Sequence, residues 1–290
     1  QGDPHSRTRG RHARGYFVLR GSRALQNNPS KLPAPPMPTD PGTESASTLA
    51  MGAVGRNLQI VAFGLIGFFV LAELGLYLRP PPGFSELAGL VVTCLLGVTV
   101  IESILSGEPA PQPPRRGLLW GVGWRYGVLV LVAILPLWVG QALLAFVMPP
   151  AERVRLVVVT GPVALPVCAW AVFSLLGTWL PARVAGGGTG LGAALRRGIA
   201  SFAYIAPRLA VGPGLMMLVA DLAGLALVLN APALTSQLPA WMVIAMTAAF
   251  GAVTAALNTA WVVFGAAVLT AAYVRARPPA PGVGPAASIP

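Results

Sequence analysis

Long apolar runs, separated by short polar or proline-rich segments, dominate the pattern of this chain. The clearest runs cover residues 57–78, 85–106, 118–148, 156–180, 205–229 and 240–273. Each is long enough to form a helix that crosses the hydrocarbon layer of a bilayer, which takes about 20 residues. The pattern therefore predicts an all-α fold, a polytopic transmembrane helical bundle with six spans.

An additional helix is expected just before the fifth span. The stretch LGAALRRGIASFAYIAPRL places apolar residues at helical spacing beside Arg196, Arg197 and Arg208. A helix with such an apolar face and arginines on its polar face lies in the plane of the membrane interface. We expect one interfacial helix here, with the three arginines as headgroup anchors.

The last run, residues 240–273, contains no charged residue. It is too long for one untilted span and too short for two spans with a loop. We interpret it as one long tilted or broken helix, with a re-entrant pair as the alternative. A stripe of small residues in this run either packs against another helix or only reflects composition; it consists of Ala248, Ala252, Ala256 and Ala260.

The two ends of the chain follow a different pattern. The first 36 residues are rich in arginine, end in prolines and contain no methionine. We expect residues 1–48 to be a disordered or non-structural tail, 49–276 a six-span membrane domain and 277–290 a disordered tail. The start remains open between sequence upstream of a true start at Met37 or Met51, a processed terminus and an organelle transit peptide.

The arginines between the spans predict an orientation. With six spans, one side of the membrane carries eight arginines and the other carries three, which are Arg79, Arg153 and Arg155. Short cytoplasmic loops are the ones enriched in Lys and Arg. We therefore expect both termini in the cytoplasm of a bacterial inner membrane, with an organelle membrane as the alternative.

The net charge of +11 does not indicate a nucleic-acid-binding protein. Of the 20 basic residues, seven lie in the first 36 residues, and most of the others lie between apolar runs. Only 10% of the residues are charged and the mean hydropathy is +0.70, whereas soluble domains are about 25% charged. The partners expected from this distribution are anionic lipid headgroups on the cytoplasmic side and other membrane subunits.

Several ionisable residues fall inside the predicted spans, where a charge is costly without a partner or a path to water. Glu73 and Asp221 both fall in the outer half, which makes them candidate coupling or polar-site residues. Glu102 and Arg125 fall in the cytoplasmic half of adjacent antiparallel spans, and we expect them to form a structural ion pair.

The residue types argue against several chemistries. The two histidines, His5 and His12, both lie in the predicted tail, so no span offers an imidazole to haem or zinc. Phosphate-binding loops, serine-hydrolase elbows and clustered metal ligands do not occur in the sequence. We expect no cofactor, no metal site and no enzymatic activity.

Two stretches carry a resemblance to a known group. LGAALRRGIASFAYIAPRLAVGPGLMMLVA and the closing WVVFGAAVLTAAYVRARPP are similar to six-span bacterial membrane domains of the kind attached to some glycerophosphodiester phosphodiesterases. In that group a basic interfacial helix precedes the fifth span, and the sixth ends in a tyrosine followed by arginines, here Tyr273, Arg275 and Arg277. The resemblance covers about 50 residues and implies an architecture without an activity, because this chain has no phosphodiesterase domain.

Two functions follow from these observations. The first is a non-catalytic integral membrane protein that acts as an accessory or assembly component of a larger membrane complex. The second is a small-molecule or proton-coupled transporter with Glu73 and Asp221 as the coupling carboxylates. Many transporters contain internal repeats, and the two halves of this sequence do not resemble each other, which favours the first function.

Overall fold

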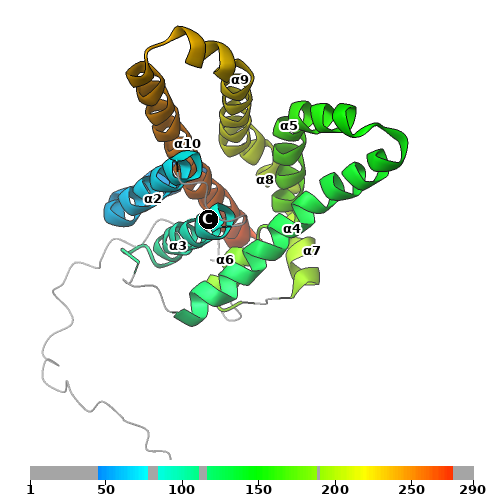
Figure 1. The fold of residues 1–290 in the computed structure, drawn as a ribbon. Helices are drawn as coiled ribbons and strands as arrows, with labels where there is room; N and C mark the ends of the chain where they lie inside the picture. The colour runs from blue at the N-terminus through cyan, green and yellow to red at the C-terminus, as the bar shows by residue number, and fades with distance from the viewer. Residues whose placement is uncertain (1–44, 78–83, 111–115, 188–189, 277–290) are drawn as a thin grey trace, which may run out of the picture. The chain divides into compact units, whose positions relative to one another are not determined.

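The described part of the chain is helical. The computed structural model describes residues 45–77, 84–110, 116–187 and 190–276, and contains no strand within them. The predicted all-α class is therefore confirmed. In chain order the elements are α1 (Ala46–Arg56), α2 (Leu58–Tyr77), α3 (Phe84–Ser106), α4 (Arg116–Val147), α5 (Pro150–Leu176), α6 (Trp179–Val184), α7 (Leu191–Ala200), α8 (Phe202–Leu209), the π-helical turn η1 (Ala210–Gly214), α9 (Leu215–Gln237) and α10 (Ala240–Arg275) (Figure 1).

Five helical segments among the described residues are long and apolar enough to cross a membrane. They are Leu87–Ser106, Arg116–Val147, Val159–Leu176, Phe202–Ala226 and Ala240–Arg275. A sixth is counted only if α1 and residues Leu58–Leu74 of α2, which meet at a bend of 94°, form one broken span. The chain is thus a helical protein of the membrane type.

α1 begins inside the segment that was predicted to be a tail. Ser45 is its N-cap, and the hydroxyl accepts a hydrogen bond of 3.1 Å from the backbone N–H of Thr48. An N-cap of this kind satisfies one of the unpaired amides at a helix start. The remainder of that predicted tail, residues 1–44, and the C-terminal segment 277–290 lie outside the described residues.

The bend between α1 and α2 is held by buried hydrogen bonds. Asn57 is 2% exposed; its side-chain amide donates to the carbonyl of Ala53 at 2.9 Å, and its Oδ1 accepts from the backbone N–H of Ala110 at 3.0 Å. Beside it, Nε of Arg56 donates to the hydroxyl of Ser103 at 3.0 Å. These contacts tie α1 to the end of α3.

The last apolar run is one continuous helix, α10, of 36 residues. At about 1.5 Å per residue it is about 54 Å long, well beyond a hydrocarbon layer of about 30 Å. The interpretation as a single long helix is confirmed, and the alternative of a re-entrant pair is wrong. Residues 262–273 of α10 are almost entirely buried, and the helix contacts α1, α2, α3, α6, α8, η1 and α9.

The packed face of α10 differs from the predicted alanine stripe. Its buried positions between 251 and 263 include Gly251, Ala255 and Thr259, whereas Ala252 and Ala256 are exposed. The buried positions and the alanine stripe both repeat every four residues along the helix. The spacing alone therefore did not select the face that contacts the other helices.

The segment before the fifth span is broken twice. α7 ends at Ala200, α8 begins at Phe202 after the single residue Ser201, and η1 then leads into α9. Pro213 lies inside η1, and because a proline has no N–H to donate, it interrupts the regular hydrogen-bond ladder of a helix. Trp170 of α5 holds this segment in place, since its indole N–H donates to the carbonyl of Ala206 at 2.7 Å.

α4 is packed along its first half only. Its buried residues run from Gly121 to Ala133. Beyond Ala133 the side chains on all sides are largely exposed, including Trp138 at 57%, Leu143 at 63% and Phe146 at 87%. The outer half of α4 therefore leaves the core together with the start of α5, which it contacts.

Candidate functional site

Glu73 on α2 lies directly against α10. A Cβ atom at Gly251 would collide with Oε1 of Glu73, so the carboxylate occupies the space that the glycine leaves. This Oε1 is buried and has no hydrogen-bond partner in the described residues. A buried acceptor without a partner is uncommon in native proteins and is a reason to look for a function.

Asp221 on α9 and Thr254 on α10 also carry buried oxygens without a hydrogen-bond partner in the described part of the chain. Gly224, one turn after Asp221, faces the ring of Phe250, which is the neighbour of Gly251. Asp221 therefore lies one turn from a contact between α9 and α10, and that contact is next to the glycine against which Glu73 packs. The sequence predicted a shared depth for Glu73 and Asp221, which stays a prediction, and it did not predict that Glu73 packs on α10.

A cavity of about 420 Å³ lies next to Glu73 between α2, α3, α4 and α10. Ala72, the neighbour of Glu73, is part of its lining. Four polar side chains contribute to an otherwise apolar wall, namely Thr93, Tyr126, Thr254 and Asn258. A mostly apolar hollow with a few polar groups is typical of small-molecule sites.

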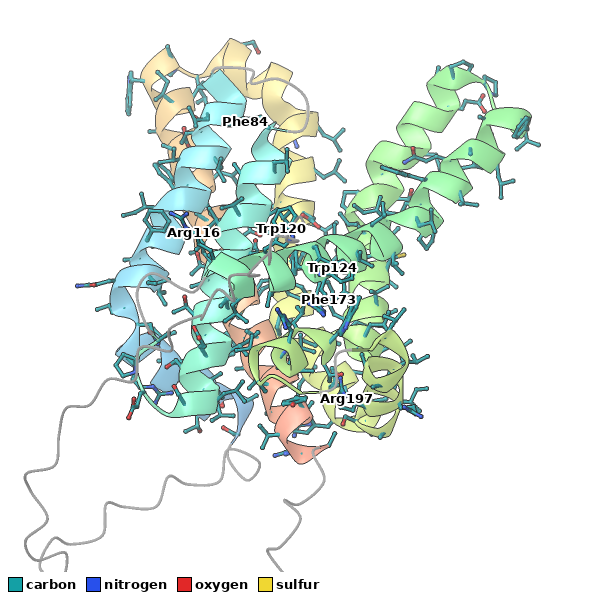
Figure 2. All side chains as sticks on the ribbon, turned by 90° about the horizontal axis from the view of Figure 1, so that it is seen from below. Phe84, Arg116, Trp120, Trp124, Phe173 and Arg197 are labelled. Atoms are coloured by element: carbon teal, nitrogen blue, oxygen red, sulfur yellow. The ribbon has the colours of Figure 1, made fainter. Side chains whose placement is uncertain are left out.

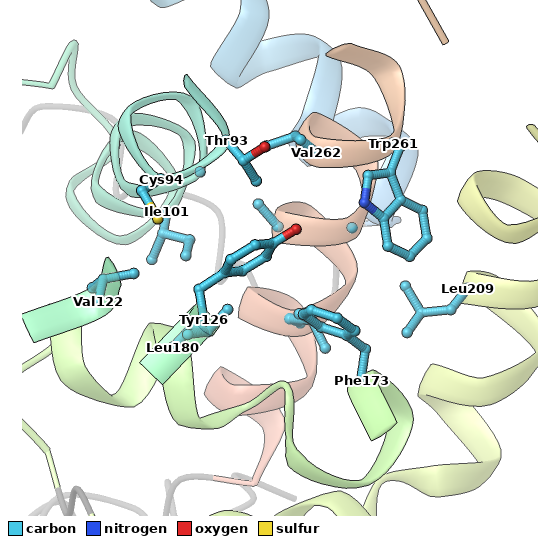
Figure 3. A pocket seen from close by; sticks show the side chains of 14 residues that line it. Thr93, Cys94, Ile101, Val122, Tyr126, Phe173, Leu180, Leu209, Trp261 and Val262 are labelled. Carbon is cyan, nitrogen blue, oxygen red and sulfur yellow. The ribbon is translucent and has the colours of Figure 1, made fainter. Parts of the chain in front are cut away.

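A second cavity, of about 50 Å³, shares Thr93 and Tyr126 with the first (Figure 3). Aromatic rings form much of its wall: the ring centroids of Tyr126 and Phe173 are 5.7 Å apart, and those of Phe173 and Trp261 are 6.1 Å apart. The side chains of Trp261 and Thr93 lie beside the Tyr126 hydroxyl. Tyr126 thus lines both cavities.

The predicted partners Glu102 and Arg125 are not brought together as an ion pair in the described residues. Arg125 is 8% exposed and donates to the carbonyl of Gly121 on its own helix. Its guanidinium lies 5.1 Å from the ring centroid of Trp124 and 5.2 Å from that of Trp179. The aromatic faces therefore supply the contacts that the sequence had assigned to a carboxylate.

The three predicted headgroup anchors lie near the C-terminus of α10. Arg197 lies 5.5 Å from the ring centroid of Tyr273, and burial lowers the pKa of its guanidinium, while the neighbouring Tyr273 acts in the opposite direction. Arg208 and Arg275 contact the same ring, that of Tyr204, at 4.0 and 3.9 Å. Arg196 is exposed.

This basic end is well separated from the first residue of α3, Phe84. Figure 2 shows Arg197 near one end of the molecule and Phe84 near the other, with Trp120 and Trp124 of α4 between them.

The sequence interpretation missed three residues, Tyr126, Thr254 and Arg183. Signals for two of them were present. Tyr126 is the direct neighbour of Arg125, which the sequence had already singled out. Arg183 comes four residues after Trp179, and this spacing places Trp179 and Arg183 on one helical face. For Thr254, an isolated threonine in an alanine-rich helix offers no such signal.

In the described residues, no three His, Cys, Asp or Glu side chains are grouped so that they could hold a metal ion. The candidate site therefore consists of Glu73, Asp221 and the adjacent polar-lined cavity. Comparison of the chain with protein-family models, with curated proteins and with solved structures finds no match, so its function has to be argued from its own geometry.

Proposed function

We propose that this chain is a non-catalytic, six-span integral membrane protein that acts as an accessory or assembly component of a larger membrane complex. In this proposal α1 and α2 form one broken span, and α7 and α8 lie at the cytoplasmic interface. Both termini are cytoplasmic, in a bacterial inner membrane. The resemblance to membrane domains of this topology agrees with the proposal and adds no activity to it.

The outer half of α4 carries the proposal. From Leu135 to Val147 most of its apolar side chains are exposed, with Leu137 and Leu144 half-buried, so this segment contributes little to the protein's own core. Gln141 is also exposed there, in the middle of an apolar stretch. A polar amide in lipid is stabilised by a hydrogen bond to another helix, which makes a neighbouring transmembrane subunit a better environment than lipid alone.

Site-specific photo-crosslinking in the native membrane tests the proposal. A photoreactive phenylalanine at Leu143, which is 63% exposed, is compared with the same group at Ile66 of α2, which is 60% exposed. We expect Leu143 to give one discrete protein adduct, and the same protein to co-purify in a fixed ratio with the unmodified chain. Lipid adducts alone at both positions, with a lone monomer after gentle purification, would contradict the proposal.

A second function, proton-coupled transport, is favoured by one observation. Glu73 packs on Gly251 of α10 beside a cavity with four polar side chains in its wall, and Glu73 and Asp221 each have a buried oxygen without a hydrogen-bond partner among the described residues. Proton relays and coupling sites in membrane proteins use carboxylates of this kind.

Proton flux into liposomes containing the purified protein distinguishes the two functions. A transporter predicts a flux under an imposed membrane potential that is lost in Glu73→Gln and Asp221→Asn and kept in Glu152→Gln, whose side chain is exposed at the start of α5. If the wild-type flux equals that of empty liposomes, proton transport is rejected and the accessory function is left.

A further inference from the structure

Two arginines from different helices meet at Gly121. On α4, Arg125 reaches back one turn and donates to the carbonyl of Gly121. On α6, Arg183 lies over the same glycine, because a Cβ atom at Gly121 would be 2.6 Å from Nε and 3.1 Å from Nη2 of Arg183. The absence of a side chain at Gly121 is what allows the second guanidinium to come so close.

Two tryptophans form the wall of this arginine pair. The rings of Trp124 and Trp179 meet edge to face, with their centroids 5.3 Å apart, and both lie beside the Arg125 guanidinium. Trp124 precedes Arg125 on α4, and Trp179 lies one turn before Arg183 on α6. Each helix thus contributes one arginine and one indole, which keeps water away from the charges on one side.

Both guanidiniums retain an unused donor. The Nε atoms of Arg125 and of Arg183 are buried and have no hydrogen-bond partner, and neither arginine forms an ion pair with a carboxylate in the described residues. The two positive charges are close enough to repel each other. Bringing like charges together in a poorly solvated place is unfavourable unless an anion lies between or beside them.

The ligand that fits such a pair is a phosphate group. Arginine guanidiniums bind phosphate oxygens through pairs of parallel N–H donors, and two arginines match the charge and the number of acceptors that a phosphate offers. A carboxylate would satisfy fewer of these donors. Phosphate in or near a membrane comes either from the headgroup of an anionic lipid or from a free phosphate in the adjacent water.

The depth of the arginine pair suits a lipid headgroup. Gly121 and Arg125 lie about 8 and 14 Å from the start of α4 at about 1.5 Å per residue. α4 has 32 residues and is about 48 Å long, more than the hydrocarbon layer of about 30 Å, so its first turns can extend into the headgroup region. Trp120, 80% exposed, and Trp124, 46% exposed, lie in the same turns.

We propose that Arg125 and Arg183, brought together over the glycine at position 121, form a binding site for the phosphate group of an anionic membrane lipid or of a free phosphate. The site is independent of Glu73 and Asp221 and of the partner surface on the outer half of α4. It is separate from the three headgroup anchors on α7 and α8, of which Arg197 and Arg208 instead stack on tyrosine rings.

Binding of defined probes to the delipidated full chain in neutral detergent tests the site, with native mass spectrometry to count the bound molecules. The probes are dioctanoyl phosphatidylglycerol, dioctanoylglycerol, which lacks the phosphate, and inorganic phosphate. The variants are Arg183→Gln, which removes a charge, and Gly121→Ala, which keeps every polar group and pushes Arg183 away. Gly117→Ala is the control, since it lies one turn earlier on α4 with no atom within 4 Å of the added Cβ.

We expect phosphatidylglycerol to bind to the wild type and to Gly117→Ala, and about tenfold more weakly to Gly121→Ala and Arg183→Gln, because the paired donors are lost. If inorganic phosphate neither binds nor competes, the lipid is the source; if it binds and displaces the lipid, free phosphate is the source. The proposal is overturned if dioctanoylglycerol binds as well as phosphatidylglycerol, or if Gly121→Ala binds like Gly117→Ala. Gel filtration confirms that each variant is folded, and Gly121→Ala serves as the test if Arg183→Gln aggregates.

Discussion

At the scale of single residues, missing side chains decide which helices can approach each other. A Cβ atom at Gly198 of α7 would overlap the backbone carbonyl of Leu175 at the end of α5. Gly177 is similarly enclosed, between the carbonyl of Phe173 and the side chain of Leu269. Such glycines allow backbones to touch, and a methyl group is enough to separate them.

Gly198→Ala is therefore expected to destabilise the protein by about 1–3 kcal/mol, the usual cost of overpacking. Gly192→Ala on the same helix meets no atom within 4 Å and is expected to stabilise by about 0.5–1 kcal/mol through helix propensity. Thermal unfolding in detergent, followed by tryptophan fluorescence, measures both. Equal effects of the two substitutions would show that α7 does not dock on α5 through Gly198.

At the scale of elements, α10 organises the bundle. It contacts α1, α2, α3, α6, α8, η1 and α9, and its burial is most complete from Val262 to Tyr273. The buried line through Gly251, Ala255 and Thr259 is the face that these contacts use. A helix of small residues suits this position, since several neighbours can approach its backbone closely.

Ala255→Leu and Ala252→Leu test which face of α10 is packed, because Ala255 is buried and Ala252, three residues earlier, is exposed. Ala255 is fully buried, and a leucine there is expected to destabilise the protein by about 1–3 kcal/mol through overpacking. Ala252 is exposed, and a leucine there points into detergent or lipid at little cost. The melting temperatures of the two variants decide the matter: a larger drop for Ala252→Leu would place the packed face on the alanine stripe instead.

At the scale of the whole molecule, arginine distribution and helix count together predict the orientation. With α1 and α2 as one span, the loop after α3 and the loop between α4 and α5 lie on opposite sides of the membrane. Glu108 is exposed in the first of these loops, and Glu152 is exposed next to the second, in the first turn of α5. A label attached at either position therefore shows which side of the membrane that loop faces.

Single cysteines at these two positions, in a background with Cys94→Ala and Cys168→Ala, measure the orientation. We expect a membrane-impermeant thiol reagent applied to intact cells to label Glu152→Cys and not Glu108→Cys, and inverted membrane vesicles to give the reverse. This follows from the arginine-rich loops remaining in the cytoplasm. If both positions were labelled from the same side, α4 would not cross the membrane between them, and the predicted topology would be wrong.

The residue scale also limits what could be read of the candidate site. Glu73 and Asp221 stand out in any apolar run because ionisable side chains in lipid are rare. The contact of Glu73 with α10 could not be recognised in this way, since Gly251 and Thr254 have no distinguishing feature in sequence. Likewise Arg125 was recognisable as a charge inside a span, but Glu102 was chosen as its partner from predicted depth and the adjacency of two antiparallel spans, and Trp124 and Trp179 surround its guanidinium instead.

The sequence by itself determined the helical membrane class and the approximate ends of most helices, whereas it left the C-terminal run open between one long helix and a re-entrant pair. These follow from run length, charge and proline, which act along the chain and need no tertiary contact. Tertiary structure alone decided which face of α10 is buried, that Arg125 meets Arg183, and that Glu73 lies on Gly251. Such contacts join segments far apart in sequence, and they depend on which backbones can approach, a property that hydrophobic periodicity does not record.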